Sequence, residues 1–146
     1  MTPIRKDVSP GENSQGENFT LLVSPDREDF RTLTMILEQD AWRVRGVRSF
    51  REAIQILKHA EHPGVVACEG ILPDGSWKDL YHFLSVSLPN PPPFIVFSRH
   101  ADESLWAEVL NLGGYDVLAK PFESAEVHRV MNMARRHATE TRAMAQ

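Results

Sequence analysis

The chain lacks several features that define other classes of protein. It has one cysteine, Cys68, among 146 residues, which excludes an intramolecular disulfide framework. No apolar run approaches the roughly 18–20 residues that a membrane-spanning helix needs, and the charged first residues lack the apolar stretch of a signal peptide. A net charge of −4 provides no basic surplus for nucleic acid or an anionic membrane. These absences favour a cytoplasmic globular protein with neither kind of partner.

The sequence does contain a regular alternation of strand and helix patterns from Phe19 onward. Residues 1–18 are polar and interrupted by proline and glycine, so they cannot bury enough apolar surface to offset the entropy of ordering. We therefore predict a disordered N-terminal segment over 1–18, one folded domain over 19–137 and a short C-terminal tail over 138–146.

Short apolar runs predict five strands, with a helix after each of them. The strands are expected at residues 20–23, 43–47, 65–68, 94–97 and 117–119. Apolar stripes of helical spacing place the first helix end near Asp40, and the last helix starts at Ser124 with basic residues 135–137 at its carboxyl end. This alternation predicts an α/β fold, a doubly wound five-stranded parallel sheet of order 2-1-3-4-5.

In such sheets the functional groups gather at the carboxyl ends of the strands. There the chain has Asp26, Glu69, Ser98 and Lys120, which are two acids, a hydroxyl and an ammonium. A purely structural interpretation remains open: an ion pair, with Asp26 capping the first helix and Ser98 closing a turn.

Four segments together carry a family resemblance. They are VSPDREDFR after the first strand, CEGILPDGSW after the third, FIVFSRHADE at the fourth and GGYDVLAKPFES around the fifth. Over about residues 19–137 the chain resembles the receiver domain of two-component response regulators. The resemblance implies a flavodoxin-like receiver fold and a cis peptide bond at Lys120–Pro121, which an X–Pro bond tolerates.

The resemblance also implies roles for individual residues. Glu69 stands where the family has its phosphate-accepting aspartate. Ser98 matches the hydroxyl residue that contacts the phosphoryl group, and Lys120 matches the lysine that pairs with the phosphoacceptor. Glu69 carries one negative charge against the ~1.5–2 of a phosphoryl group. Two interpretations stay open: Glu69 mimics the phosphorylated state, or it is inert.

Two further positions depart from the family pattern. The acidic pair that holds Mg²⁺ in the family reads Pro25-Asp26 here, and proline has no side-chain oxygen. Because Mg²⁺ demands near-octahedral oxygen coordination, we expect no cofactor, or Mg²⁺ held weakly by Asp26, Glu69 and the Ile71 carbonyl. Val117 occupies the position of the aromatic switch residue and cannot perform an aromatic rotamer change.

The leading hypothesis is an atypical, non-enzymatic receiver that acts in phosphorelay-type signalling through protein–protein contact. Its partner would be a histidine kinase or a downstream signalling protein, and a homodimer is a further candidate. The resemblance implies a contact face on the fourth helix, fifth strand and fifth helix. With nine residues after His137, we expect no attached output domain.

Two alternatives remain. The first is a conventional Mg²⁺-dependent receiver that is phosphorylated. The second is a flavodoxin-like cofactor-binding protein, although SPDRED stands where that class has a Ser/Thr/Gly-rich phosphate loop.

Overall fold

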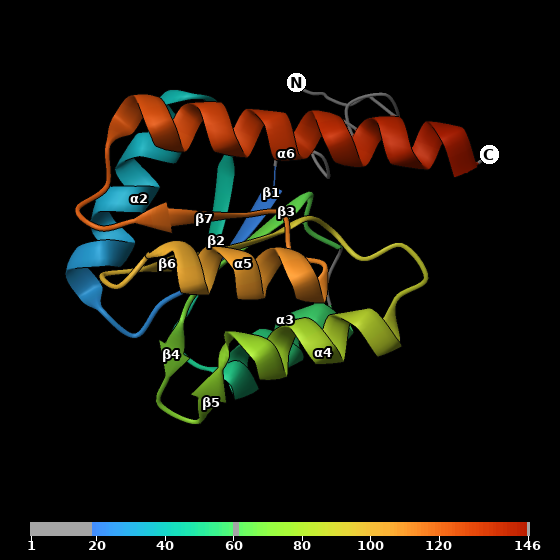
Figure 1. Ribbon diagram of the computed structural model, residues 1–146, viewed down its shortest axis with the longest axis horizontal. Coiled ribbons are helices and arrows are strands. Elements are labelled where there is room, and N and C mark those ends of the chain that lie inside the picture. Colours follow the sequence, from blue (N-terminus) through green and yellow to red (C-terminus); the bar gives the residue numbers. More distant parts are fainter. Residues whose placement is uncertain (1–18, 60–61, 146) are drawn as a thin grey trace, which may run out of the picture.

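Five parallel strands form the centre of the computed structural model, which describes residues 19–59 and 62–145 (Figure 1). The strands are β1 (Phe19–Val23), β2 (Arg43–Val47), β3 (Val65–Glu69), β6 (Phe94–Ser98) and β7 (Asp116–Ala119). Their order is β2-β1-β3-β6-β7, which confirms the predicted order 2-1-3-4-5. Each strand extends at most one residue beyond its predicted range. The predicted disordered segment, residues 1–18, lies outside the described residues.

Five helices cover the two faces of this sheet (Figure 1). They are α2 (Arg27–Gln39), α3 (Phe50–His59), α4 (Trp77–Ser87), α5 (Glu103–Leu112) and α6 (Ser124–Ala145). Side chains of α2 and α6 build one apolar cluster with one face of the sheet, and those of α3, α4 and α5 build a second cluster with the other face. Strands β1, β3 and β6 are therefore almost entirely buried, which explains their uninterrupted apolar sequences.

The last helix is longer than its sequence pattern predicted. We expected an end near His137, where basic side chains suit a helix terminus, but α6 continues to Ala145. The added residues contain no glycine or proline and are rich in alanine, which explains why the helix does not stop. Within residues 19–59 and 62–145, no helix is long and apolar enough to cross a bilayer.

A short hairpin, which the sequence pattern did not reveal, follows β3. Its strands are β4 (Ile71–Leu72) and β5 (Gly75–Ser76), paired antiparallel. The Asp74 carboxylate at its turn accepts hydrogen bonds from the backbone N–H groups of Phe50 (2.9 Å) and Arg51 (3.0 Å). These donors belong to the first turn of α3, so Asp74 caps a helix from 24 residues away and fixes the hairpin beside β3.

This cap leads to a prediction about acid sensitivity. Hydrogen bonds from the Arg51 and Phe50 N–H groups hold the pKa of Asp74 below its ordinary value. The stabilisation is therefore present above the usual aspartate pKa of about 3.9 and is lost as pH falls through the lowered pKa. We expect Asp74→Asn to lower the urea midpoint at pH 7, because an amide accepts these bonds more weakly than a carboxylate.

The difference in urea midpoint between the wild type and Asp74→Asn should narrow as the pH drops below about 4. The control is Glu140→Gln, a change at an exposed side chain of α6. If the difference in urea midpoint between wild type and Asp74→Asn stays constant into strong acid, the Asp74 carboxylate does not stabilise α3 as a cap.

Candidate functional site

The carboxyl edge of the sheet holds a lysine bonded to two carboxylates. Lys120 follows β7, and its Nζ lies 2.5 Å from Glu69 Oε1 and 2.6 Å from Asp29 Oδ2. Glu69 ends β3, and Asp29 lies in the first turn of α2. The peptide bond Lys120–Pro121 is cis, as predicted. Three elements that are distant in sequence thus meet at one ammonium group.

This triad is shielded from water. The side chains of Lys120, Asp29 and Glu69 are only 9%, 13% and 14% exposed. Burial acts to lower the pKa of Lys120, but hydrogen bonds from its ammonium to Asp29 and Glu69, with their charges, outweigh it and raise that pKa. Lys120 is therefore charged at neutral pH, and this contribution to stability would be lost only as pH rises through the raised pKa.

Asp26 caps the first helix, which is the structural role that the sequence left open beside the metal-ligand role. Its Oδ1 accepts hydrogen bonds from the N–H groups of Glu28 (2.8 Å) and Asp29 (3.0 Å), so it caps α2. The bond from the Asp29 N–H is the main cause that lowers the pKa of Asp26, with smaller contributions from the charges of Lys120 and Arg99. Asp26 lies near the pocket, but Asp29 is the acid that binds Lys120. Our sequence reasoning missed that role.

Ser98 and Val117 lie close to this site without joining the triad. Ser98 Oγ accepts a hydrogen bond from the His100 N–H at 3.0 Å, which closes the turn after β6. Among the hydrogen bonds of the described residues, none runs from the Ser98 hydroxyl to Glu69. Val117, on β7, is half-buried and packs against the apolar cluster beneath α3, α4 and α5.

The candidate Mg²⁺ ligands at this edge are few, and most of their oxygen atoms already accept hydrogen bonds. One oxygen of Glu69 binds Lys120 and the other accepts the Gly70 N–H at 3.0 Å, while Asp26 is engaged in its cap. Pro25 supplies no side-chain oxygen. In the part of the chain that the structure describes, no three His, Cys, Asp or Glu side chains are arranged to hold a metal. Pro25 and the pairing of Glu69 with Lys120 therefore leave fewer protein ligands for Mg²⁺ than the family's acidic pair with its aspartate would supply.

Removal of the ammonium should destabilise the fold by leaving two carboxylates shielded together. For Lys120→Met we expect a loss of about 2–3 kcal/mol in unfolding free energy, somewhat less than for a fully buried broken pair. Adding Glu69→Gln and Asp29→Asn should recover most of the loss, because the uncompensated charges disappear. Urea unfolding of the single and triple variants measures both values; equal stability of the two variants would contradict this account.

Comparisons with known proteins identify the family of this chain. The sequence profile of the response regulator receiver domain matches residues 21–132. The chain is 30% identical over 115 residues to a Mycobacterium tuberculosis protein named "Probable transcriptional regulatory protein TcrX"; the match covers 78% of this chain and 48% of that protein. The chain thus spans about half the length of this curated relative.

Two solved structures illustrate the likeness in fold. A signal receiver domain from Vibrio parahaemolyticus superposes with a TM-score of 0.80 at 19% identity, over 88% of this chain and 98% of that one. The non-phosphorylated HemR receiver domain from Leptospira biflexa superposes with a TM-score of 0.70 at 26% identity, over 80% of this chain and 93% of that one.

Proposed function

Because this chain belongs to the response regulator receiver domain family, we propose that it serves two-component signalling as an atypical receiver that acts through protein contact. In this proposal Glu69 occupies the phosphoacceptor position and holds the pocket in one arrangement, which phosphate does not switch. The observation that carries the proposal is the double ion pair of Lys120 with Glu69 and Asp29.

The charges at the pocket argue against phosphorylation of Glu69. A phosphoryl group carries ~1.5–2 negative charges, so its transfer to the Glu69 carboxylate would add roughly 0.5–1 net negative charge to a shielded site that already contains Asp29, with Asp26 nearby. Lys120 is the cation that contacts Glu69, and it is already bonded to two carboxylates. Without Mg²⁺, the added charge would depend on Lys120 and the more distant Arg99 for compensation.

Between the two interpretations of Glu69, the contacts favour an inert pocket over a phosphoryl mimic. A mimic would engage the hydroxyl that the family uses to sense phosphate, but the Ser98 hydroxyl faces the His100 N–H. The Lys120 ammonium that a mimic would engage is shared with Asp29. Val117 offers no aromatic ring that could change rotamer in response.

A metal titration of restored variants tests this proposal. Glu69→Asp alone should gain no tight Mg²⁺ binding, because Pro25 still lacks an oxygen ligand. Pro25→Asp with Glu69→Asp should bind Mg²⁺ at least tenfold more tightly than either single variant, since two carboxylates then face the ion. Quenching of tryptophan fluorescence, or calorimetry, reports the binding.

Phosphorylation is measured on the wild type and on the same double variant. Incubation with a small-molecule phosphodonor and Mg²⁺ should leave the wild-type mass unchanged and add one phosphoryl group to the double variant. A stable phosphoryl adduct on Glu69 of the wild-type protein would overturn the proposal and favour a conventional receiver.

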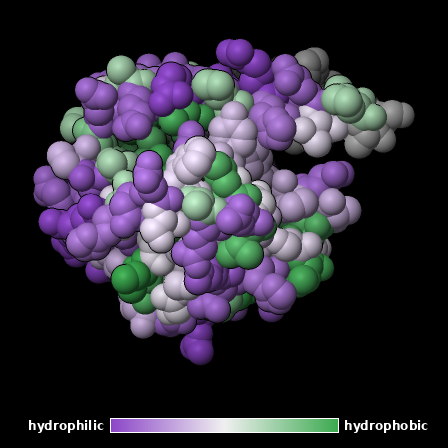
Figure 2. All heavy atoms as spheres, in the orientation of Figure 1, coloured by the Kyte–Doolittle hydropathy of each residue, from purple (hydrophilic) through white to green (hydrophobic). Residues whose placement is uncertain are grey.

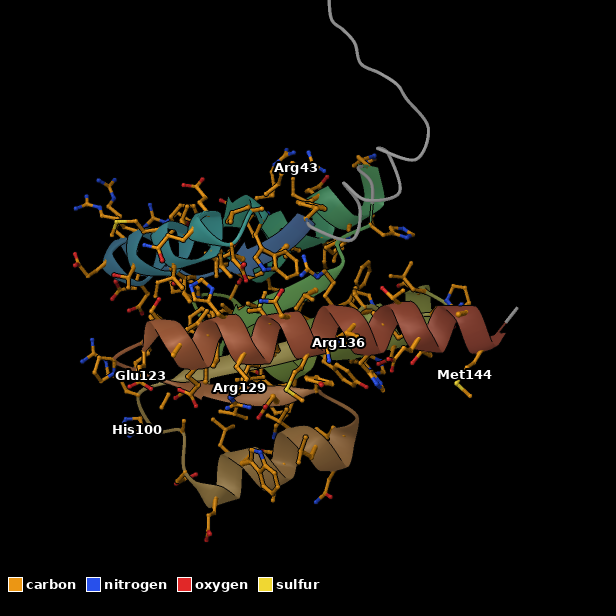
Figure 3. All side chains as sticks on the ribbon, turned by 90° about the horizontal axis from the view of Figure 1, so that it is seen from above. Arg43, His100, Glu123, Arg129, Arg136 and Met144 are labelled. Carbon is orange, nitrogen blue, oxygen red and sulfur yellow. The ribbon has the colours of Figure 1, made fainter. Side chains whose placement is uncertain are left out.

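We further propose that the contacts of this module use the face formed by α5, β7 and α6. Large apolar side chains are solvent-exposed on these helices, among them Trp106 on α5 (50%) and Met133 on α6 (45%). In Figure 3, Arg129 and Arg136 lie along the edge of α6 nearer to α5. Exposed tryptophan and arginine are the residue types that most often dominate the binding energy of protein interfaces.

Self-association offers a direct test of this face. If the protein forms a homodimer, Trp106→Ala should weaken it at least tenfold in analytical ultracentrifugation, as expected for an aromatic hot spot. Val86→Ala is the matched control, because Val86 is 70% exposed but lies on α4. Equal weakening of the dimer by both variants would contradict the proposed face. A wild-type protein that stays monomeric would exclude a second copy of the chain as the partner.

A further inference from the structure

A cavity lies at the amino ends of β6 and β7, the end of the sheet opposite to Lys120. Its volume is about 260 Å³, and its walls come from four parts of the chain: α4, the proline-rich loop before β6, the end of α5 and the far end of α6. In Figure 1 the end of α6 extends past the sheet above that loop, and Figure 2 shows a hollow between them. None of these residues takes part in the triad.

Aromatic rings form two sides of the cavity. The Tyr115 and His137 rings contact each other with centroids 5.4 Å apart. Tyr81 is held by an edge-to-face contact with Phe94, also at 5.4 Å. Helix α5 ends at Gly113 with φ of 109°, and a Cβ there would lie 2.2 Å from the Tyr81 hydroxyl oxygen. The glycine therefore leaves space for the Tyr81 hydroxyl at the cavity wall.

The other two sides combine proline rings with small or polar side chains. Pro91, Pro92 and Pro93 form one wall. Ala138 and Thr141 form the other, on the part of α6 that extends beyond its predicted end. The continuation of the helix past His137 therefore supplies one wall of the cavity.

The lining selects for a particular ligand chemistry. Tyr81, Tyr115 and His137 present ring faces and edges for stacking. Asn90 and Thr141 add a side-chain amide and a hydroxyl for hydrogen bonds. Among the described residues that line the cavity, none is Asp, Glu, Lys or Arg, so an ionised ligand would be desolvated without a counter-charge.

We propose that this cavity binds an uncharged, planar heteroaromatic molecule with a hydrogen-bonding edge, such as a carboxamide or a nucleobase. Its volume lies just below the ~300–1,000 Å³ typical of sites for drug-sized ligands, which limits the occupant to one or two rings. Such a ligand contacts α4 and α6 together. Binding of the ligand would therefore act on the domain through α4 and α6, without any change at the Lys120 triad.

Nicotinamide is the test probe, with two comparison compounds that each change one property. Nicotinate keeps the ring but carries a negative charge, and cyclohexanecarboxamide keeps the amide but is not planar. In ¹H–¹⁵N spectra of the full chain, nicotinamide should cause saturable shifts at Tyr115 and His137, with a Kd of about 1 mM or tighter. Both comparison compounds should bind at least fivefold more weakly.

Two variants on the same helix locate the binding. Ala138→Phe should fill the cavity and abolish the shifts, whereas Ala143→Phe, an identical change at an exposed residue outside the lining, should leave them intact. If Ala138→Phe prevents folding, Thr141→Val replaces it and should weaken nicotinamide about threefold by removing one hydroxyl. Absence of saturable shifts, equal binding of nicotinate, or equal effects of the two phenylalanine variants would each overturn the proposal.

Discussion

The functional edge of this domain depends on one interaction, the ammonium of Lys120 held between Glu69 and Asp29. It connects the end of β7 with the end of β3 and the first turn of α2. A shielded ion pair returns roughly the free energy that its desolvation costs, so its net contribution to stability is small. What it provides is a defined arrangement, because loss of the lysine leaves two carboxylates together away from water. The position of Lys120 therefore fixes how the ends of β3 and β7 and the start of α2 meet.

This constraint explains why the departures from the receiver pattern agree with one another. A phosphorylated pocket has to balance the charge of the phosphoryl group, which requires a metal ion and a lysine that is available to it. Here Pro25 removes a metal ligand, Asp29 supplies a second carboxylate to Lys120, and Ser98 bonds within its own turn. In the proposed function, each change reduces the capacity of the pocket for phosphate, and none of them disturbs the sheet.

The two ends of the sheet consequently have different chemistry. The carboxyl edge is charged and closed by the triad, and the Asp74 cap holds the adjacent hairpin against α3. At the opposite end of the strands, the cavity beneath the end of α6 has aromatic walls and no Asp, Glu, Lys or Arg among its described lining residues. The central strands β1, β3 and β6 between the two regions are buried on both faces and closely packed. The protein contact and the ligand binding that we propose therefore use separate residues.

The sequence alone determined the five strands, their order and the positions of Glu69, Ser98 and Lys120 at one edge, because hydrophobic periodicity and the right-handed crossover rule leave few other topologies. It did not determine which acid binds Lys120. Asp26, Glu28 and Asp29 all lie at the start of α2, where any acid is favoured by the helix dipole, and only the packing of α2 over the sheet directs Asp29 inward. The Asp74 cap and the cavity beneath α6 were likewise decided by tertiary structure. Both join residues tens of positions apart, whereas sequence periodicity reports only on neighbours within a few turns.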